Sequence, residues 1–211
     1  MKFFKNKKTV SFLVSGRGSN FSVVARKILI KEINAKFGIL ICDKPDAKAL
    51  STAKEEFKMN SYFVDPKSYF TKTEHEDEMV RLLKEVKTDL IVTAGYMRLL
   101  SPYFVSKFKN RIINIHPALL PSFPGLNAQK QALDYGVKIT GCTSHFIDEG
   151  VDTGPIIMQS AIRIYDNDLL SDVSARILAE EHKILPESVK LFCEDKLHIV
   201  GRSVIIKYYI V

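Results

Sequence analysis

The chain has 211 residues, of which 46% are hydrophobic, and a formal net charge of +7. That length supports one substantial core, and no apolar run approaches the ~20 residues of a membrane-spanning helix, so we expect one domain over residues 1–211 and no membrane partner. The three cysteines are far apart and form no CxxC pair. This spacing argues against a disulfide framework and a metal site, and it favours the cytoplasm.

The basic charge is the one feature that suggests a nucleic-acid partner. However, the lysines are scattered among acidic residues such as those of Glu74–Glu78, and no RNA-binding signature occurs. A basic surface that attracts small anions explains the charge at least as well. A nucleic-acid-binding module without catalysis is therefore a distant alternative, and we expect no nucleic acid as a partner.

From the N-terminus, short strand-like runs alternate with helical patterns, an order typical of crossover units and a mostly parallel sheet. The expected strands of this part are 9–14, 36–42, 61–64, 89–94 and 111–115. The expected helices start near residue 21, cover 47–57 and cover 78–86. The last two strands are almost wholly apolar, as in central strands that helices cover on both faces. The predicted fold is a doubly wound α/β sheet.

The second half mixes helices with further strands. The expected elements are a helix over 128–135, strands over 138–147 and 155–164, a long helix from 169 and a terminal hairpin over 195–211. Gly136 favours the left-handed conformation that ends a helix. Pro186 should kink or divide the long helix because it lacks a backbone N–H.

The loop after the first expected strand has the sequence SGRGSN, residues 15–20. Small residues at a strand-to-helix turn expose backbone N–H groups at a helix N-terminus, where the helix dipole also favours an anion. The loop matches neither GxGxxG nor a P-loop, so a single phosphomonoester fits better than a dinucleotide or a nucleoside triphosphate. The alternative is a tight turn in which Ser19 or Asn20 caps the helix.

Asn114 and His116 stand at the carboxyl end of a central strand, where ligands bind in open α/β sheets. Strand alternation points both side chains to one side and Ile115 to the other. An amide donor beside an imidazole suits a carbonyl oxygen that gains negative charge during attack. A lone buried histidine is more often bonded to backbone, but the pairing with Asn114 favours a functional site.

The turn after His145 is rich in acidic residues and glycine. Asp148, Glu149 and Asp152 could simply form turns, and they lack the further ligands that a metal site needs. A carboxylate near His116 would favour the imidazolium and fix the orientation of the ring, so that the ring could donate a proton or a hydrogen bond. The residues alone do not select among the three acids.

Residues 94–102, with the sequence AGYMRLLSP, follow the fourth expected strand. Backbone exposed in a glycine-containing loop, with Met97 and Leu100 nearby, could form one wall of a slot for a flat heteroaromatic ring. An ordinary loop with its methionine and leucine in the core explains the same residues equally well.

Taken together and in order, SGRGSN, AGYMRLLSP, NIHPALLPSFPG and the later HF, DEGVD and GP resemble the phosphoribosylglycinamide formyltransferases, folate-dependent enzymes of purine biosynthesis. The resemblance covers nearly the whole chain. It implies an N-terminal half, about 1–108, that binds a ribonucleotide phosphate, and a C-terminal part, about 109–211, with the catalytic and folate-binding residues. The implied reaction transfers the formyl group of 10-formyltetrahydrofolate to the glycyl amine of glycinamide ribonucleotide, without a metal, in a monomer or weak homodimer.

The resemblance also implies roles for individual residues. Asn114, His116 and Asp152 match the catalytic trio, which favours Asp152 among the three acids and leaves His145 as support. The residues implied to bind the ribonucleotide are Gly18, Ser19 and Asn20 at the phosphate and Glu181 at the sugar hydroxyls. The residues implied to bind the folate are Lys72, Met97, Arg98, Leu99, Leu100 and Asn114.

The chain departs from the family pattern at a few positions. Asn127 and Gln129 stand where some members have histidines, and Leu178 stands where some have glutamine. Of the related families, methionyl-tRNA formyltransferases add a C-terminal barrel, for which this chain is too short, and formyltetrahydrofolate deformylases add an N-terminal regulatory domain, whereas this chain starts at its first strand. We therefore expect the small transformylase, with a formyltetrahydrofolate hydrolase as the alternative.

Overall fold

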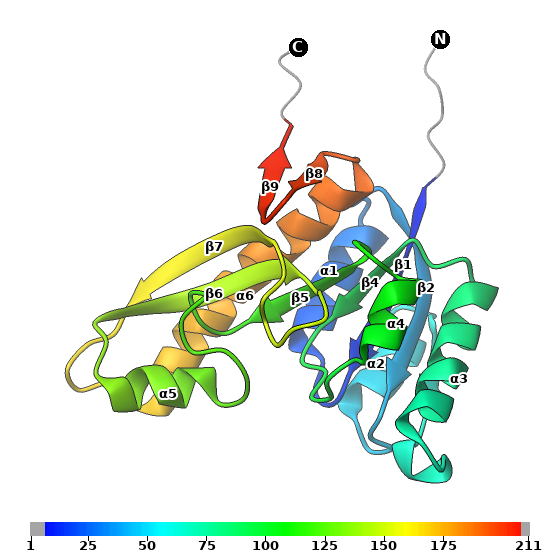
Figure 1. Ribbon diagram of the computed structural model, residues 1–211, viewed down its shortest axis with the longest axis horizontal. Coiled ribbons are helices and arrows are strands. Elements are labelled where there is room, and N and C mark those ends of the chain that lie inside the picture. Colours follow the sequence, from blue (N-terminus) through cyan, green and yellow to red (C-terminus); the bar gives the residue numbers. More distant parts are fainter. Residues whose placement is uncertain (1–6, 208–211) are drawn as a thin grey trace. The chain divides into compact units, whose positions relative to one another are not determined.

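The computed structural model describes residues 7–207 (Figure 1). The chain divides into two compact units, Met1–Arg98 and Leu99–Val211. Among residues 7–207, none of the helices combines the length and the apolar character that crossing a bilayer requires.

The first unit is a parallel sheet with helices on both faces (Figure 1). Its strand order is β3-β2-β1-β4, and every pair in it is parallel. The strands are β1 (Lys8–Val14), β2 (Ala35–Cys42), β3 (Asn60–Phe63) and β4 (Leu90–Thr93). The helical segments are α1 (Ser19–Leu29), α2 (Lys48–Glu55), the 3₁₀ turn η1 (Pro66–Ser68) and α3 (Lys72–Glu85). Right-handed crossovers place α1 and α2 on one face and α3 on the other.

Aromatic packing fixes the start of α1 against β1. The ring centroids of Phe12 and Phe21 are 4.9 Å apart, and those of Phe21 and Phe57 are 5.5 Å apart, both in edge-to-face arrangements. Such pairs contribute about 0.5–1.5 kcal/mol beyond the burial of their area. Because Phe12 lies on β1 and Phe21 in the first turn of α1, this packing holds the loop between the two elements in place.

Helix α3 begins at Lys72, six residues before the predicted start at residue 78. The Thr71 hydroxyl accepts a hydrogen bond from the Glu74 N–H at 3.1 Å, and the Glu74 carboxylate accepts one from the Phe70 N–H at 3.0 Å. This reciprocal cap stabilises the helix start. The first turns are polar, so the apolar spacing that predicts a helix appears only near Met79, and the predicted start was therefore wrong.

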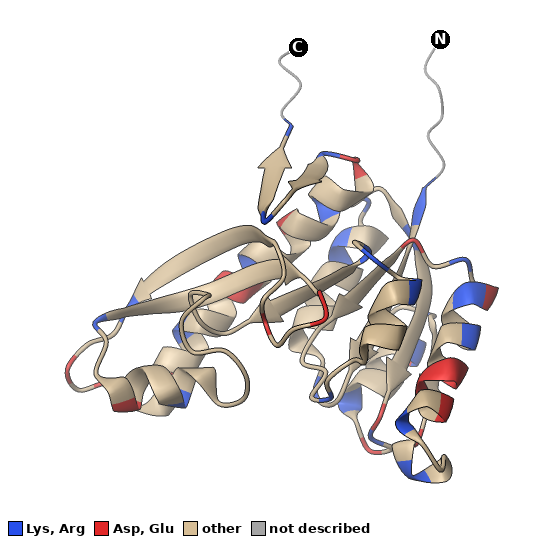
Figure 2. Ribbon diagram, viewed as in Figure 1, with Lys and Arg blue, Asp and Glu red and all other residues tan. Residues whose placement is uncertain are grey.

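Basic and acidic residues are interspersed along α3 (Figure 2). Arg81 forms ion pairs with Glu78, at 2.6 Å, and with Glu85. Because opposite charges neutralise one another locally, α3 does not present the continuous basic stripe that binding to a polynucleotide backbone requires.

The second unit pairs most of its strands antiparallel. Its strand order is β5-β6-β7-β9-β8, in which only β7 and β9 are parallel. The strands are β5 (Ile112–His116), β6 (Ile139–Phe146), β7 (Ile156–Arg163), β8 (Leu197–Val200) and β9 (Ser203–Ile206). The helices are α4 (Pro102–Lys107), which the sequence does not predict, α5 (Ala128–Tyr135) and α6 (Leu170–Cys193). The β8–β9 pair confirms the hairpin, whose predicted last residues, 208–211, lie outside the described residues.

Helix α6 runs through Pro186 without a break. Of the two expected outcomes at this proline, a kink or a division, the division is therefore wrong. A proline removes one backbone hydrogen bond from a helix interior. Here Leu185, Pro186 and Val189 are all buried, and burial of this apolar face offsets the loss. The α/β fold class, the long helix and the C-terminal hairpin are confirmed.

Candidate functional site

Two of the candidate catalytic residues, Asn114 and His116, lie on β5, which pairs antiparallel with β6 in the second unit. The register of β5 and β6 places Asn114 opposite His145 and His116 opposite Thr143. Cross-strand partners project from the same face of a sheet, and alternate residues of one strand share a face. Asn114, His116 and His145 therefore lie on one face, and both histidines are buried, with 4% and 1% of their surfaces exposed.

Asp152 is the acid that reaches this face. Its Oδ2 lies 3.2 Å from Nδ1 of His116 and accepts a hydrogen bond from the Gly125 N–H at 2.8 Å, and its Oδ1 lies 3.6 Å from Nε2 of His145. Asp148 instead accepts hydrogen bonds within its own turn, from the Gly150 N–H at 3.1 Å and the Thr153 hydroxyl at 2.6 Å. The geometry thus selects Asp152 and leaves Asp148 as a turn former.

Both ring nitrogens of His116 face hydrogen-bond acceptors. Nε2 lies 2.8 Å from the carbonyl oxygen of Phe123, and Nδ1 faces the carboxylate of Asp152. An imidazolium has two N–H donors, so this environment satisfies the protonated ring. The ring is bonded to backbone, as the simpler interpretation of a buried histidine predicts, and it also contacts a carboxylate, as the functional interpretation predicts.

His145 has the opposite environment. Its Nδ1–H donates to the carbonyl of Phe146 at 2.9 Å, so Nε2 is the acceptor and receives the Asn114 side-chain N–H at 3.2 Å. Burial lowers the pKa of His145, and this effect exceeds the opposing influence of the Phe146 carbonyl and of Asp152. A neutral His145 thus orients the Asn114 amide, a specific contact that the sequence indicates only as general support.

The lowered pKa of His145 predicts how stability responds to acid. Below its ordinary value of 6.5 the unfolded chain binds a proton that the folded chain resists, so the free energy of unfolding falls as the pH falls below about 6.5. We expect the melting temperature of the wild type to fall between pH 7.5 and pH 5.5, and that of His145→Gln to fall less. Thermal unfolding followed by circular dichroism measures both. An equal fall in the variant would contradict the assignment.

In the first unit, the 15–20 loop leaves the N-terminus of α1 without a side-chain cap. Gly18, with φ of 74°, is the N-cap residue, and Ser19 and Asn20 already belong to the helix, so the alternative in which one of them caps it was wrong. A Cβ atom on Gly18 would lie 2.8 Å from Cβ of Ala49, in a backbone conformation that favours glycine. The close approach of α2 therefore requires glycine at this position.

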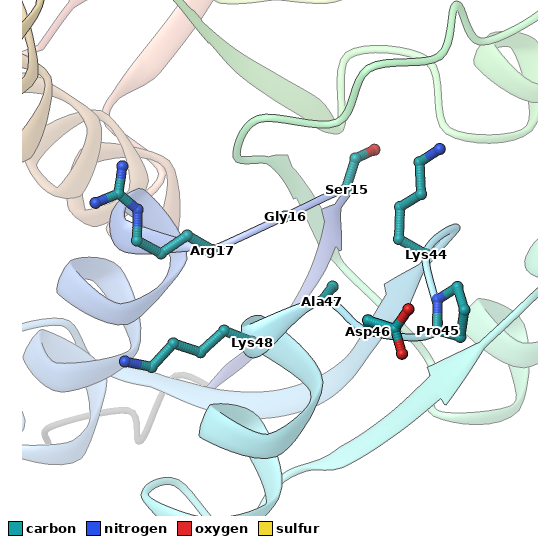
Figure 3. Close-up of a pocket in the computed structure, with 8 residues that line it drawn as sticks. All are labelled: Ser15, Gly16, Arg17, Lys44, Pro45, Asp46, Ala47 and Lys48. Atoms are coloured by element: carbon teal, nitrogen blue, oxygen red, sulfur yellow. The ribbon is translucent and has the colours of Figure 1, made fainter.

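A pocket of about 430 Å³ adjoins this loop (Figure 3). The residues that line it are Ser15, Gly16, Arg17, Lys44, Pro45, Asp46, Ala47 and Lys48. Three of these side chains are cationic and one is anionic, so the pocket favours an anion. Lys44 and Lys48 were not predicted as site residues, although they follow the carboxyl end of β2, beside β1, where ligands bind in such sheets.

The segment after β4 contacts the same loop. The Ser15 N–H donates to the carbonyl of Gly95 at 3.1 Å, and the Ser15 hydroxyl accepts the Met97 N–H at 2.9 Å. Met97 and Leu99 are each 64% exposed, so the alternative that places the methionine in the core was wrong. Arg98 is exposed and Leu100 is half-buried. Exposed apolar side chains of this kind can contact a flat ring.

The other predicted residues have partners within their own units. Lys72 lies in the first turn of α3, with its ammonium 3.9 Å from the buried carboxylate of Glu76. Glu181 lies on α6 and is buried. The pKa of Cys142 is raised to about 12, mainly by burial of the thiol and next by the negative charge of Glu181. The Ser174 hydroxyl donates to the Gln129 side chain at 3.0 Å. Within residues 7–207, no cluster of three or more His, Cys, Asp or Glu side chains is arranged to hold a metal ion.

Comparison with known proteins shows a continuous family match. A sequence model of the formyl transferase family matches residues 8–189. The chain is 42% identical over 183 residues to a phosphoribosylglycinamide formyltransferase from Bacillus subtilis, an alignment that covers 87% of this chain and 93% of that protein. A crystal structure of glycinamide ribonucleotide transformylase 1 from Symbiobacterium toebii has a TM-score of 0.94 and 41% identity, covering 98% of this chain and 97% of that one.

A formyltetrahydrofolate deformylase from Pseudomonas syringae is more distant. It is 27% identical and has a TM-score of 0.87. The match covers 95% of this chain but only 66% of the deformylase chain. The Bacillus and Symbiobacterium relatives are therefore closer in sequence and in length. Because the family match takes in most of each compact unit, this chain belongs to the formyl transferase family.

Proposed function

We propose that this chain transfers the formyl group of 10-formyltetrahydrofolate to the glycyl amine of phosphoribosylglycinamide, which yields the N-formyl product and tetrahydrofolate in purine biosynthesis. The observation that carries this proposal is the contact between Asp152 and His116. His116 lies on β5, the strand that also carries Asn114. The named activity of the Bacillus and Symbiobacterium relatives supports the same reaction.

The cluster suits formyl transfer because the reaction builds negative charge on the formyl oxygen and moves one proton. The Asn114 amide and the His116 imidazolium stabilise that oxygen in the tetrahedral intermediate. To do so, His116 exchanges the Phe123 carbonyl for the formyl oxygen as the acceptor of its Nε2–H. Asp152 balances the imidazolium charge and, through water, helps carry the proton from the attacking amine to the departing nitrogen.

For the folate, the proposed contacts begin in the segment after β4. Met97, Arg98, Leu99 and Leu100 line the place of the pterin ring, and the exposure of Met97 and Leu99 supports this role. Asn114 contacts the transferred group. Lys72, whose side chain is 53% exposed, pairs with a carboxylate of the folate.

For the ribonucleotide, the proposed phosphate site is the N-terminus of α1. Gly18, Ser19 and Asn20 supply backbone N–H groups there, where no side-chain cap competes with an anion. The cations that line the adjoining pocket add favourable charge. In the second unit, Glu181 is the proposed acceptor for the sugar hydroxyls.

The Gly18→Ala variant tests the phosphate site. Alanine in the left-handed conformation costs about 1–2 kcal/mol, and its Cβ would collide with Ala49. Because the displaced loop no longer presents its backbone N–H groups to the phosphate, we expect the KM for the ribonucleotide to rise about tenfold or more, which corresponds to about 1.4 kcal/mol of binding free energy. Gly136→Ala is the matched control, because Gly136 has a φ of 81° with nothing within 4 Å of the added Cβ. Steady-state kinetics with the ribonucleotide varied should show a raised KM in the first variant alone.

Turnover of the purified protein tests the reaction itself. Release of tetrahydrofolate from 10-formyltetrahydrofolate should require the ribonucleotide and should match the N-formyl product in amount. Release without the acceptor would support the hydrolase alternative instead. Binding to a polynucleotide that weakens steeply with salt, without turnover, would support the nucleic-acid-binding alternative.

We further propose a cytoplasmic protein that needs no metal, binds small molecules as its partners and acts as a monomer or weak homodimer. Sedimentation over a range of protein concentrations tests the oligomeric state. A tight assembly at the lowest concentration would contradict this part of the proposal.

A further inference from the structure

A row of three side chains crosses the strands of the second unit beside the catalytic histidine. The registers place His116 opposite Thr143 and Thr143 opposite Gln159. Because partners in register project from the same face, all three side chains lie on the face that carries the candidate active site. Thr143 is fully buried there.

Thr143 and Gln159 bind the backbone of the loop that follows His116. The Thr143 hydroxyl donates to the carbonyl of Ala118 at 2.7 Å and accepts the Leu120 N–H at 3.0 Å. The Gln159 side-chain amide donates to the carbonyl of Leu120 at 2.9 Å and to the Thr143 hydroxyl at 3.0 Å. The two side chains thus form one connected group with residues 118–120.

The same loop returns to the catalytic pair a few residues later. The Phe123 carbonyl accepts from His116, and the Gly125 N–H donates to Asp152. Phe123 has a φ of 54°, a conformation that a non-glycine residue adopts only when its surroundings hold it there. The hydrogen bonds from Thr143 and Gln159 restrain the backbone at residues 118–120, which end three residues before Phe123.

We propose that Thr143 and Gln159 are positioning residues that set the geometry of His116 and Asp152 through the loop, an inference that rests on the proposed formyl transfer. The hydrogen bonds of the two side chains go to residues 118 and 120 and to each other, so both act through the backbone of residues 118–125. A misplacement of catalytic groups by about 1 Å can cost about 100-fold in rate. The two residues should therefore affect turnover much more than substrate affinity.

Thr143→Val removes the hydroxyl and keeps the shape of the side chain. We expect kcat to fall about 10- to 100-fold with both KM values little changed, and we expect Thr143→Ser, which keeps the hydroxyl, to restore kcat. Thr140→Val is the matched control. Thr140 is buried on the same strand but on its other face, and its hydroxyl has no hydrogen-bond partner among the described residues. This control should turn over like the wild type.

Gln159→Leu and the double variant test the connection. The Gln159 side chain is more exposed than Thr143, so its variant should fold even if Thr143→Val does not. The double variant should lose little more activity than Thr143→Val alone, because both residues act on the same loop. If the kcat losses of Thr143→Val and Gln159→Leu were fully additive in the double variant, the two residues would not act through the same loop.

A spectroscopic measurement separates positioning from general destabilisation. The ¹⁵N–¹H signal of His116 Nε2–H, bonded to the Phe123 carbonyl, should shift or exchange faster with water in Thr143→Val and in Gln159→Leu, and should stay unchanged in Thr140→Val. The proposal would be overturned if kcat fell while this signal stayed unchanged, or if Thr143→Val and Gln159→Leu both kept the wild-type kcat. An equal loss of kcat in Thr140→Val would also overturn it. Absence of turnover in the wild type would refute the proposed function. The His116 signal would still show whether Thr143 and Gln159 position the ring.

Discussion

Replacing His116 by alanine should lower kcat about 100- to 1000-fold, the typical cost of removing one donor to an oxyanion. Nε2 of the ring lies against the Phe123 carbonyl, and Nδ1 lies against the Asp152 carboxylate. Without the imidazole, the formyl oxygen keeps only the Asn114 amide as a donor in this cluster. Single-turnover kinetics measure the chemical step directly.

Ribonucleotide binding should survive in His116→Ala, because the proposed phosphate site in the first unit is unchanged. Equilibrium dialysis with labelled ribonucleotide measures that affinity. His198→Ala is the matched control, since His198 is half-buried on β8 and its Nε2 has no hydrogen-bond partner among residues 7–207. Near-normal turnover in His116→Ala, or a comparable loss in His198→Ala, would remove His116 from the mechanism.

The contrast between the two histidines shows how one strand pair supports two roles. His116 faces a carbonyl and a carboxylate, which suits a charged ring, while burial and the Asn114 amide keep His145 neutral. Neighbouring titratable groups whose environments differ are typical of acid–base sites. Here the difference comes from which acceptors the loop and the turn present to each ring.

Much of the framework could be predicted from the sequence. The strands were found because their apolar runs are short and bounded by turns, and Asn114 and His116 were paired because alternation places them on one face. The pattern failed where polar residues hold a helix, as at the capped start of α3. At Pro186 the helix is not divided, because burial rather than local propensity keeps it continuous.

The finer geometry of the site could not be predicted because it depends on backbone conformation. Phe123 and Asp152 both have positive φ, a conformation that is uncommon for phenylalanine and that aspartate tolerates without requiring it. That conformation brings the Phe123 carbonyl onto His116 and the Asp152 carboxylate between the two histidines. From the sequence, Asp152 could be preferred over the other two acids only through a family resemblance. In the structure, Asp152 is the one of the three with ion-pair distances to His116 and His145.

Asp152→Asn should lower kcat about 100- to 10,000-fold, the range that a positioned acid or base contributes. Asparagine has nearly the same shape and tolerates the φ of 54° at this position, so the turn should persist. The change removes the negative charge that faces Nδ1 of His116 at 3.2 Å. The imidazolium then loses its counter-charge, and the amine loses the carboxylate that helps to move its proton.

Asp148→Asn is the matched control for this substitution, in the same turn. Asp148 accepts its hydrogen bonds within the turn, from Gly150 and Thr153, so this variant should lose some stability but keep its turnover. Steady-state kinetics and thermal unfolding of both variants separate the two effects. If Asp148→Asn lost as much activity as Asp152→Asn, the catalytic carboxylate would have to be reassigned, because the turn as a whole and not the contact with His116 would then account for the loss.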